Sequence, residues 1–292
     1  FRKAVYQPEI VRAMTPPADA PVRSWQSYRA MFVNPQRIAA GQTFRQRHAA
    51  ALTRAAEQFG VPAEIILAII GVETVFGQNM GNYRVIDALT TLAFDYPRRA
   101  DYFRAELENY LLFSRDTGVD VLGLRGSYAG AIGIPQFMPG SYRRFAIDFD
   151  GDGRTNLVDS GADAIGSVAN YLRQHGWAPG QPVAVPAEVR GAEWKTLVEA
   201  GIKPTWRLSE ILAHGVTLAA SGGATPEVPA PDVLGTLIAL ETPGQPPAYW
   251  VGFQNFYTIT RYNRSSFYAM AILELALALR EAGAERTRMD AK

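Results

Sequence analysis

The apolar stretch VPAEIILAIIGVETVFG, residues 61–77, most constrains how this chain can fold. Pro62 near its start and Gly77 near its end are typical of helix boundaries. The segment between them is apolar on nearly all sides, which predicts a central helix buried in the protein. In that helix Glu73 shares one face with three isoleucines of the same run.

A single carboxylate on such a face calls for an explanation. Its charge is costly unless it is paired or unless its pKa rises. A raised pKa would keep Glu73 protonated, as a general acid requires. A partly buried glutamate held by an arginine is the alternative that the periodicity leaves open.

The other segments predict a mainly α protein. Residues 1–22 look irregular, and residues 41–60 form an amphipathic pattern that predicts one helix closed by Gly60. Proline, glycine and valine become common over 178–248, which predicts a small β-containing subdomain. A long helix is expected at the C-terminal end.

Composition excludes several classes of protein. The net charge of +1 over 292 residues gives no global field for nucleic acid. The absence of cysteine excludes disulfides and thiolate chemistry. No apolar stretch reaches the roughly 18 residues that span a bilayer. The chain begins at Phe1 rather than Met, so we expect a processed or trimmed product; any export signal or lipid anchor would have lain upstream.

The segment DFDGDGRTNLVD, residues 148–159, has the spacing of a calcium loop. Asp148, Asp150 and Asp152 fall at positions 1, 3 and 5, and Gly153 falls at position 6. Carboxylate oxygens and a sharp glycine turn suit a hard cation such as Ca²⁺. A polar turn without metal is the alternative.

The end of this loop is less well defined by the sequence. Arg154 would offer its backbone carbonyl at position 7. Asp159 falls at position 12 where glutamate is usual, and Asp163 is a rival last ligand if the loop is longer. Since only one such loop is present, we expect a structural site rather than a calcium sensor.

Glycines and prolines concentrate in GSYAGAIGIPQFMPGSY, residues 126–142. A glycine-rich backbone can approach a ligand closely, and the Gln136 amide can both donate and accept hydrogen bonds to sugars. A tight loop without a ligand is the alternative. Tyrosines such as Tyr28, Tyr171 and Tyr257 could stack on sugar rings or line a core.

Together these motifs resemble one family closely. GVETVFG, ALTTLAFDYPRRADYF, GSYAGAIGIPQFMPGSY, DFDGDGRTNLVD, DAIGSVANYLRQHGW and NFYTITRYN are similar to segments of the membrane-bound lytic transglycosylase B family of murein-degrading enzymes. The resemblance runs from about Tyr28 to the C-terminal helix. It implies a lysozyme-like α core, a helical domain from both chain ends, an EF-hand-like calcium loop and a small β subdomain.

The resemblance also implies domain boundaries. The helical domain would comprise 1–60 with 264–292. The lysozyme-like catalytic core would comprise 61–177 with 249–263, including the calcium loop over 148–163. The β-containing subdomain would comprise 178–248.

Functional residues follow from the resemblance position by position. Glu73 matches the family's catalytic acid/base, and Arg98 and Arg99 match an arginine pair on the peptide-bearing side of the cleft. The remaining matches belong to the glycan site: Ser127, Gln136, Phe137, Met138, Tyr28, Tyr171, Tyr257 and Tyr262. The implied metal ligands are Asp148, Asp150, Asp152, Arg154 and either Asp159 or Asp163, with no organic cofactor.

The implied reaction cleaves the MurNAc–GlcNAc β-1,4 bond of peptidoglycan without water and leaves a 1,6-anhydro-MurNAc end. A lysozyme-type hydrolase is the first alternative; it needs a second carboxylate, for which Asp87 and Asp95 are the best candidates. A non-catalytic glycan-binding scaffold and a calcium sensor are weaker alternatives.

The cellular setting follows from the same resemblance. We expect peptidoglycan glycan strands and proteins of cell-wall synthesis or degradation as partners, and no nucleic acid. The expected location is the periplasm of a Gram-negative bacterium, in soluble or lipid-anchored form. The sequence does not define the oligomeric state.

Overall fold

The computed structural model describes residues 2–15, 24–219 and 229–290. They divide into two compact units. The first unit lies within 1–21, 43–54 and 69–171, and the second lies within 22–42, 55–68 and 172–292. The three-part division expected from the sequence stays a prediction.

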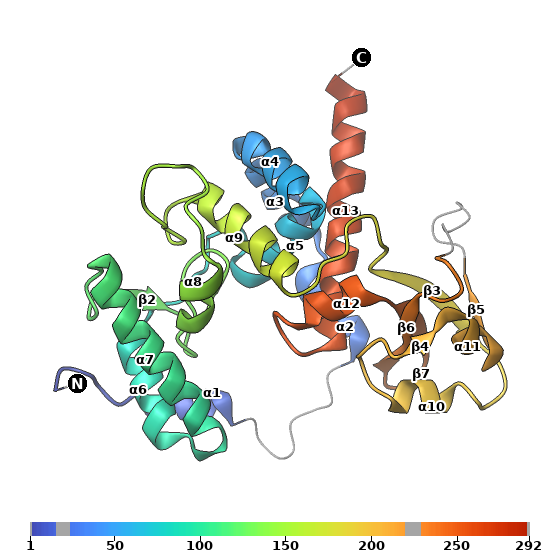
Figure 1. The fold of residues 1–292 in the computed structure, drawn as a ribbon, viewed down its shortest axis with the longest axis horizontal. Coiled ribbons are helices and arrows are strands. Elements are labelled where there is room, and N and C mark those ends of the chain that lie inside the picture. Colours follow the sequence, from blue (N-terminus) through green and yellow to red (C-terminus); the bar gives the residue numbers. More distant parts are fainter. Residues whose placement is uncertain (1, 16–23, 220–228, 291–292) are drawn as a thin grey trace. The chain divides into compact units, whose positions relative to one another are not determined.

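The first unit is built on an antiparallel pair of helices, α6 and α7, with short elements around them (Figure 1). Its helices are α1 (Pro8–Met14), α6 (Val85–Asp95), the 3₁₀ helix η1 (Pro97–Arg99), α7 (Ala100–Thr117) and α8 (Pro139–Phe145). Strands β1 (Tyr83–Arg84) and β2 (Arg125–Gly126) pair antiparallel and tie the start of α6 to the loop after α7.

Four helices contribute residues to both units: α3 (Pro35–Arg47), α4 (Ala49–Phe59), α5 (Ala63–Thr74) and α9 (Gly161–Gln174). The apolar run 61–77 does form the buried helix that its composition predicts, since Ile66 to Ile70 of α5 are all 0% exposed. The apolar side chains leave this helix little amphipathic character, because it is surrounded on every side.

Helices from both chain ends pack together in the second unit, as the family resemblance implies. These are α2 (Trp25–Phe32), α3 (Pro35–Arg47) up to Gln42, and α13 (Ser266–Asp290). The Trp25 and Phe267 rings meet edge to face at 5.5 Å, and the buried Gln42 amide donates to the Leu279 carbonyl at 2.7 Å. The short helix α12 (Gln254–Thr260) packs against α13.

A five-stranded antiparallel sheet forms the β subdomain of the second unit (Figure 1). Its order is β4 (Trp206–Arg207), β6 (Leu234–Thr242), β7 (Gln245–Gly252), β3 (Ala184–Val189) and β5 (Val216–Leu218). Helices α10 (Lys195–Glu199) and α11 (Leu208–Ala213) supply Leu197 and Ile211 to its apolar core. The predicted fold class, mainly α with a small β subdomain, is confirmed.

Two local predictions are wrong. Residues 8–14 are helical rather than irregular: Pro8 begins α1, and the Gln7 amide donates to the Thr91 side chain at 3.0 Å, so α6 holds this segment in place. The pattern over 41–60 is not one helix, because α3 ends at Arg47 and α4 begins at Ala49. His48 at this break packs tightly on Gly161, where a Cβ atom would lie 2.4 Å from the imidazole ring.

Among the described residues no single helix has the length and composition to cross a membrane. Helices α4 and α5 meet the criterion only as a pair, and they are bent by 116° at the break between them.

Candidate functional site

Glu73 is the next-to-last residue of α5. It is half-buried, while its neighbours Val72 and Thr74 are 9% and 0% exposed. The helix therefore carries a partly accessible carboxyl group at the carboxyl-terminal end of an apolar core element. The structure agrees here with the arrangement that the sequence predicts.

The chain reverses direction directly after Glu73 through a strained turn. Val75 and Phe76 have φ angles of 51° and 59°, the left-handed region that side chains with a Cβ atom disfavour. Each such residue costs on the order of 1–3 kcal/mol, so the surroundings must hold it in place. Phe76 is held by its ring, which is 8% exposed and lies 5.5 Å from the Phe44 ring.

The glycine-rich loop lies against this turn. The Thr74 hydroxyl donates to the Ile134 carbonyl at 2.7 Å and accepts from the Gly77 amide at 2.9 Å. Gly133 (φ +73°) must remain glycine, because a Cβ atom there would lie 2.3 Å from the Leu157 carbonyl oxygen. The loop that carries Ser127 and Gln136 is thus bonded to the end of the Glu73 helix.

Ser127 shapes its own part of the loop. Its side-chain oxygen accepts hydrogen bonds from the amides of Ala129 and Ala131, at 3.2 and 3.0 Å. Within the described residues no acceptor is bonded to the Ser127 hydroxyl proton. Ser127 can therefore donate one hydrogen bond to a ligand.

Gln136 has a different capacity from the one that its residue type suggests. Its side-chain nitrogen donates to the carbonyls of Gly133 and Met80, at 2.9 and 3.2 Å. Both amide protons are then engaged with the backbone, and only the side-chain oxygen remains for a ligand. Its own φ of 53° shows that the loop holds it in a strained conformation.

Phe137 and Tyr171 are largely interior residues of the first unit. Phe137 is 2% exposed, and its ring lies 5.5 Å from that of Tyr171, which is 7% exposed and also meets Phe145. Met138 is half-buried and caps the N-terminus of α8. Of these three, Met138 has the most accessible side chain.

Arg98 and Arg99 lie in η1 and are both exposed. They line a cavity of about 570 Å³ together with Arg104, Phe94 and Tyr102. The Arg99 guanidinium lies 4.2 Å from the centre of the Tyr102 ring. Asp101 also lines the cavity and pairs with Arg104 at 3.1 Å. Arg98 and Arg99 are therefore the cations that suit a ligand carboxylate, and the two aromatic rings suit apolar groups.

Tyr28, Tyr257 and Tyr262 belong to the second unit. Tyr28 is 9% exposed and its ring lies 5.7 Å from that of Phe267. Tyr257 and Tyr262 are half-buried; Arg261 lies 5.9 Å from the Tyr257 ring, and Tyr262 stacks on Tyr268 at 6.4 Å. Glu73 and the other predicted glycan-site residues belong to the first unit.

Three carboxylates of the predicted metal loop converge. One oxygen each from Asp148, Asp150 and Asp163 lies within 4.8 Å of the others, a donor set that fits a hard cation. Asp163 is fully buried at the N-terminal turn of α9. Asp159 instead accepts from the Asn156 side chain at 3.2 Å, so the geometry favours Asp163 as the closing ligand.

Asp152 lies outside this converging group, whereas Asp148 organises the loop backbone. Asp152 accepts from the backbone amide of Arg154 at 2.8 Å and is exposed. The Asp148 carboxylate accepts from the amides of Gly151 and Gly153, at 2.7 and 2.8 Å, which curls the loop around it.

Neither rival carboxylate has the half-buried setting of Glu73 at the end of an apolar helix. Asp87 is 3% exposed; it pairs with the Arg84 guanidinium at 2.7 Å and accepts from the Val5 amide at 2.9 Å. These bonds engage Asp87 in holding the N-terminal segment. Asp95 is an exposed residue that ends α6.

The sequence interpretation missed Glu106, a carboxyl group of α7 that is 7% exposed. It accepts from the Gly140 amide at 2.7 Å, at the N-terminus of α8. Burial raises the pKa of Glu106, while the Gly140 amide and Arg144 act in the opposite direction. Its spacing from Phe103 and Tyr110 places it on the buried face of the helix, which was the available signal.

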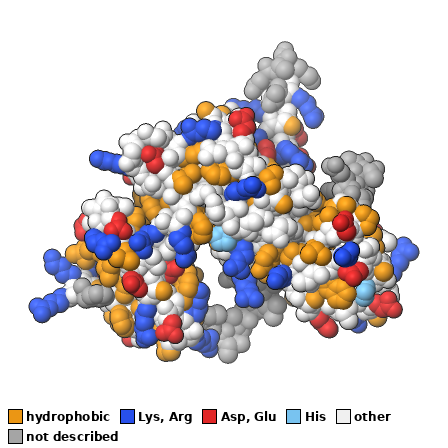
Figure 2. All heavy atoms as spheres, viewed as in Figure 1, with side chains coloured by type: hydrophobic (Ala, Val, Ile, Leu, Met, Phe, Trp, Pro, Cys, Tyr) orange, Lys and Arg blue, Asp and Glu red, His pale blue; other side chains and the backbone are white. Residues whose placement is uncertain are grey.

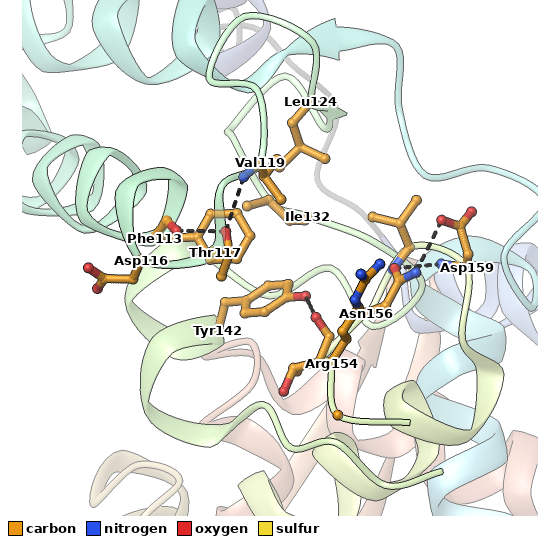
Figure 3. A pocket seen from close by; sticks show the side chains of 13 residues that line it. Phe113, Asp116, Thr117, Val119, Leu124, Ile132, Tyr142, Arg154, Asn156 and Asp159 are labelled. Atoms are coloured by element: carbon orange, nitrogen blue, oxygen red, sulfur yellow. Dashed lines mark hydrogen bonds between the residues drawn. The ribbon is translucent and has the colours of Figure 1, made fainter. Parts of the chain in front are cut away.

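A separate cavity of about 740 Å³ lies between the end of α7, Tyr142 of α8 and the predicted metal loop (Figure 3). Three of its polar side chains are bonded to other lining residues: Thr117 donates to the Phe113 carbonyl, Tyr142 to the Thr155 carbonyl, and Asn156 to Asp159. It shares Ile132 with the glycine-rich loop. On the face shown in Figure 2, basic and acidic side chains are both present, in line with the small net charge.

The fold, mainly α with a small β subdomain, matches that of lysozyme-like glycan-cleaving enzymes. The family model described as a transglycosylase SLT domain matches residues 1–277. The chain belongs to this family and is a lytic murein transglycosylase, a lyase that acts on peptidoglycan.

Two relatives show the likeness over nearly the whole chain. Membrane-bound lytic murein transglycosylase B of Escherichia coli (strain K12) is 46% identical over 264 residues, which cover 90% of this chain and 69% of that protein. The crystal structure of the soluble lytic transglycosylase SltB1 from Pseudomonas aeruginosa is 47% identical, with a TM-score of 0.89 over 97% of this chain and 92% of that chain.

Two further solved structures carry ligands. The Escherichia coli lytic transglycosylase Slt35, in complex with calcium, is 43% identical, with a TM-score of 0.82 over 96% of this chain and 85% of that chain. SltB3 from Pseudomonas aeruginosa, in complex with NAG-anhNAM-pentapeptide, is 31% identical, with a TM-score of 0.81 over 95% of this chain and 72% of that chain.

Proposed function

We propose that Glu73 acts as a single general acid and then general base, and that the reaction leaves 1,6-anhydro-MurNAc ends. The observation that carries this proposal is the position of Glu73, half-buried at the end of the buried helix α5 and bonded through Thr74 to the glycine-rich loop. Asp87, the best rival carboxylate, is engaged with Arg84 and the Val5 amide.

The proposed reaction starts from the neutral form of Glu73. The carbonyl groups at the end of α5 give this end of the helix a partial negative charge, which disfavours a second negative charge nearby. Glu73 then donates its proton to the departing glycosidic oxygen, and the MurNAc ring develops oxocarbenium character.

Substrate groups and the loop meet the developing positive charge. The acetamido oxygen of MurNAc can approach C1, and the free Ser127 proton can hold and orient that group by a hydrogen bond. Gln136 contributes an acceptor only, because its amide protons are bonded to Met80 and Gly133.

The second half of the reaction uses the same carboxyl group. Ionised Glu73 accepts the proton of the C6 hydroxyl, and O6 forms a bond to C1 of the same sugar. The glycosidic bond breaks, one C–O bond forms, and Glu73 returns to its protonated form without consuming water. NAG-anhNAM-pentapeptide, the ligand in the SltB3 structure, carries an anhydro end, which supports this product for the present chain.

We further propose one structural calcium ion, held by Asp148, Asp150 and Asp163. The convergence of these oxygens and the calcium complex of Slt35 support the assignment. The ion would supply charge neutralisation within the 148–163 loop and no step of the reaction.

Substrate contacts beyond Glu73 are proposed from the family resemblance and local chemistry. The cavity of Arg98 and Arg99 would receive the stem peptide, whose carboxylates match its charge. Tyr28, Tyr171, Tyr257 and Tyr262 would contact the glycan. The expected setting is the bacterial periplasm, with cell-wall enzymes as partners.

The test compares Glu73→Gln with Asp95→Asn, a matched removal of an exposed carboxylate. Both proteins should fold and bind purified sacculi, but only Glu73→Gln should lose nearly all turnover, because an amide neither donates nor accepts the proton. Mass spectrometry of wild-type products should show ends lighter by one water than hydrolysis products. Reducing ends as the main product, or an active Glu73→Gln protein, would contradict the mechanism.

A further inference from the structure

A fully buried hydroxyl group directly follows the proposed acid in the chain. We propose that Thr74 is a positioning residue: it holds Glu73 in register with the glycine-rich loop and so sets the geometry of proton transfer. This inference rests on the proposed role of Glu73.

The hydrogen bonds of Thr74 join three segments. Its single proton goes to the Ile134 carbonyl at 2.7 Å, a far better distance than the 3.4 Å to the Ile70 carbonyl. Its oxygen accepts from the Gly77 amide at 2.9 Å. The end of α5, the turn after it and the glycine-rich loop therefore share one side chain.

Each segment that Thr74 joins is held firmly in place. On one side, the Thr74 carbonyl accepts from the Asn79 amide at 2.9 Å across the left-handed residues Val75 and Phe76. On the other side, the Ile134 amide donates to the Leu157 carbonyl at 2.8 Å. A hydrogen bond between two rigid segments fixes the position of one relative to the other, whereas a bond to a mobile loop would not.

Glu73 is covalently next to this junction, so loss of the Thr74 hydroxyl would let the helix end and the loop move apart. A second bond from the loop to this region runs from the Gln136 side chain to the Met80 carbonyl at 3.2 Å. It meets the chain several residues beyond Glu73 and cannot fix the carboxyl group as directly. A displacement of about 1 Å costs on the order of 10²-fold in rate when proton transfer is the chemical step.

Thr74→Val is nearly isosteric and removes both hydrogen bonds. We expect kcat on purified sacculi to fall about 10²-fold while KM and sacculus binding change little, because the ligand-facing groups of the loop remain. Thr74→Ser keeps the hydroxyl and should restore most of kcat. If Thr74→Val does not fold, Thr74→Cys can replace it in the comparison of kcat with the wild type and Thr74→Ser, since a thiol is only a weak hydrogen-bond donor.

Thr91→Val is the matched control for loss of stability. Thr91 is 1% exposed in the same unit, and its hydroxyl accepts a long-range bond from the Gln7 amide at 3.0 Å. Both valine variants should lower the Tm, but only Thr74→Val should lower the kcat of the protein that remains folded. Equal kcat values for the two variants would overturn the positioning role.

A double variant separates this inference from the role of Glu73. If Thr74 acts through Glu73, adding Thr74→Val to Glu73→Gln should leave the residual rate unchanged. A further drop of the same 10²-fold would show that Thr74 acts independently, and would overturn the inference. An active Glu73→Gln protein would instead overturn the proposed function.

Discussion

Asp163 offers the sharpest test of how the metal loop is built. Its side chain is 0% exposed and accepts three backbone hydrogen bonds, from Phe149 at 2.7 Å, Asp150 at 3.2 Å and Asn156 at 2.7 Å. Asp163→Asn keeps one oxygen for Phe149 and Asp150 but turns an N–H donor toward the Asn156 amide. The variant thus loses one charge-assisted bond and leaves a partly buried donor unpaired, at a cost of about 2–3 kcal/mol.

This cost is measurable without any metal. In EDTA the Tm of Asp163→Asn should fall by roughly 4–12 °C relative to the wild type. Asp159→Asn is the matched control: Asp159 is exposed and bonded only to the Asn156 side chain, so its loss should cost under about 0.5 kcal/mol. Calorimetry is the suitable assay, because all five tryptophans belong to the second unit and their fluorescence would not report on this loop.

Added Ca²⁺ then tests the ligand set. At a hundredfold excess over Kd a bound ion adds about 2.7 kcal/mol to the wild-type unfolding free energy. Asp159→Asn should keep this gain and Asp163→Asn should lose most of it. Equal Tm values for the two variants in EDTA would refute the hydrogen-bond argument. Loss of the Ca²⁺ effect in Asp159→Asn would refute the choice of Asp163 as the closing ligand.

Three further outcomes are expected. Burial raises the pKa of Glu106, so the folded state favours its protonated form. The contribution of Glu106 to the unfolding free energy should therefore be greatest below its unfolded-state pKa and fall as pH rises through its folded-state pKa. Urea unfolding of Glu106→Gln at several pH values should lack this fall. Tyr257→Ala should lower turnover more than Tm. Tyr171→Ala and Tyr28→Ala should each also lose about 3–5 kcal/mol of stability because their rings are buried against Phe137 and Phe267, so the phenylalanine variants are the ones for their kinetics. Arg98→Ala with Arg99→Ala should slow turnover of peptide-bearing glycan but not of glycan stripped of peptides; equal slowing on both substrates would contradict a peptide site.

Features set by local chemistry could be predicted from the sequence. The buried helix α5 follows from a continuous apolar run, and the convergence of Asp148 and Asp150 follows from a fixed spacing within one loop. Features set by distant partners could not. Helix α1 has only seven residues and depends on bonds to α6, such as the one between the Val5 amide and Asp87, 82 positions away.

The same distinction explains the limits at the site. Residue type indicates that Gln136 can donate and accept, but its protons are engaged by Gly133 and by Met80, which lies 56 positions away. Glu106 meets its partner Gly140 across 34 positions. Residue spacing predicts contacts between neighbours along one helix or strand. These hydrogen bonds join separate elements, so they form only when those elements pack together.

Backbone strain within the described residues is concentrated around the proposed acid. Val75, Phe76 and Gln136 are the non-glycine residues there with φ between +51° and +59°, and each has local preferences that oppose this conformation. They follow Glu73 in the chain or lie in the loop bonded to Thr74. A sequence optimised for stability alone would place glycine or asparagine at such positions, so the strain is retained at a cost in free energy. Such a cost is expected at a functional site. In the proposed mechanism a rigid backbone must hold one carboxyl group in position both to donate a proton and to accept one.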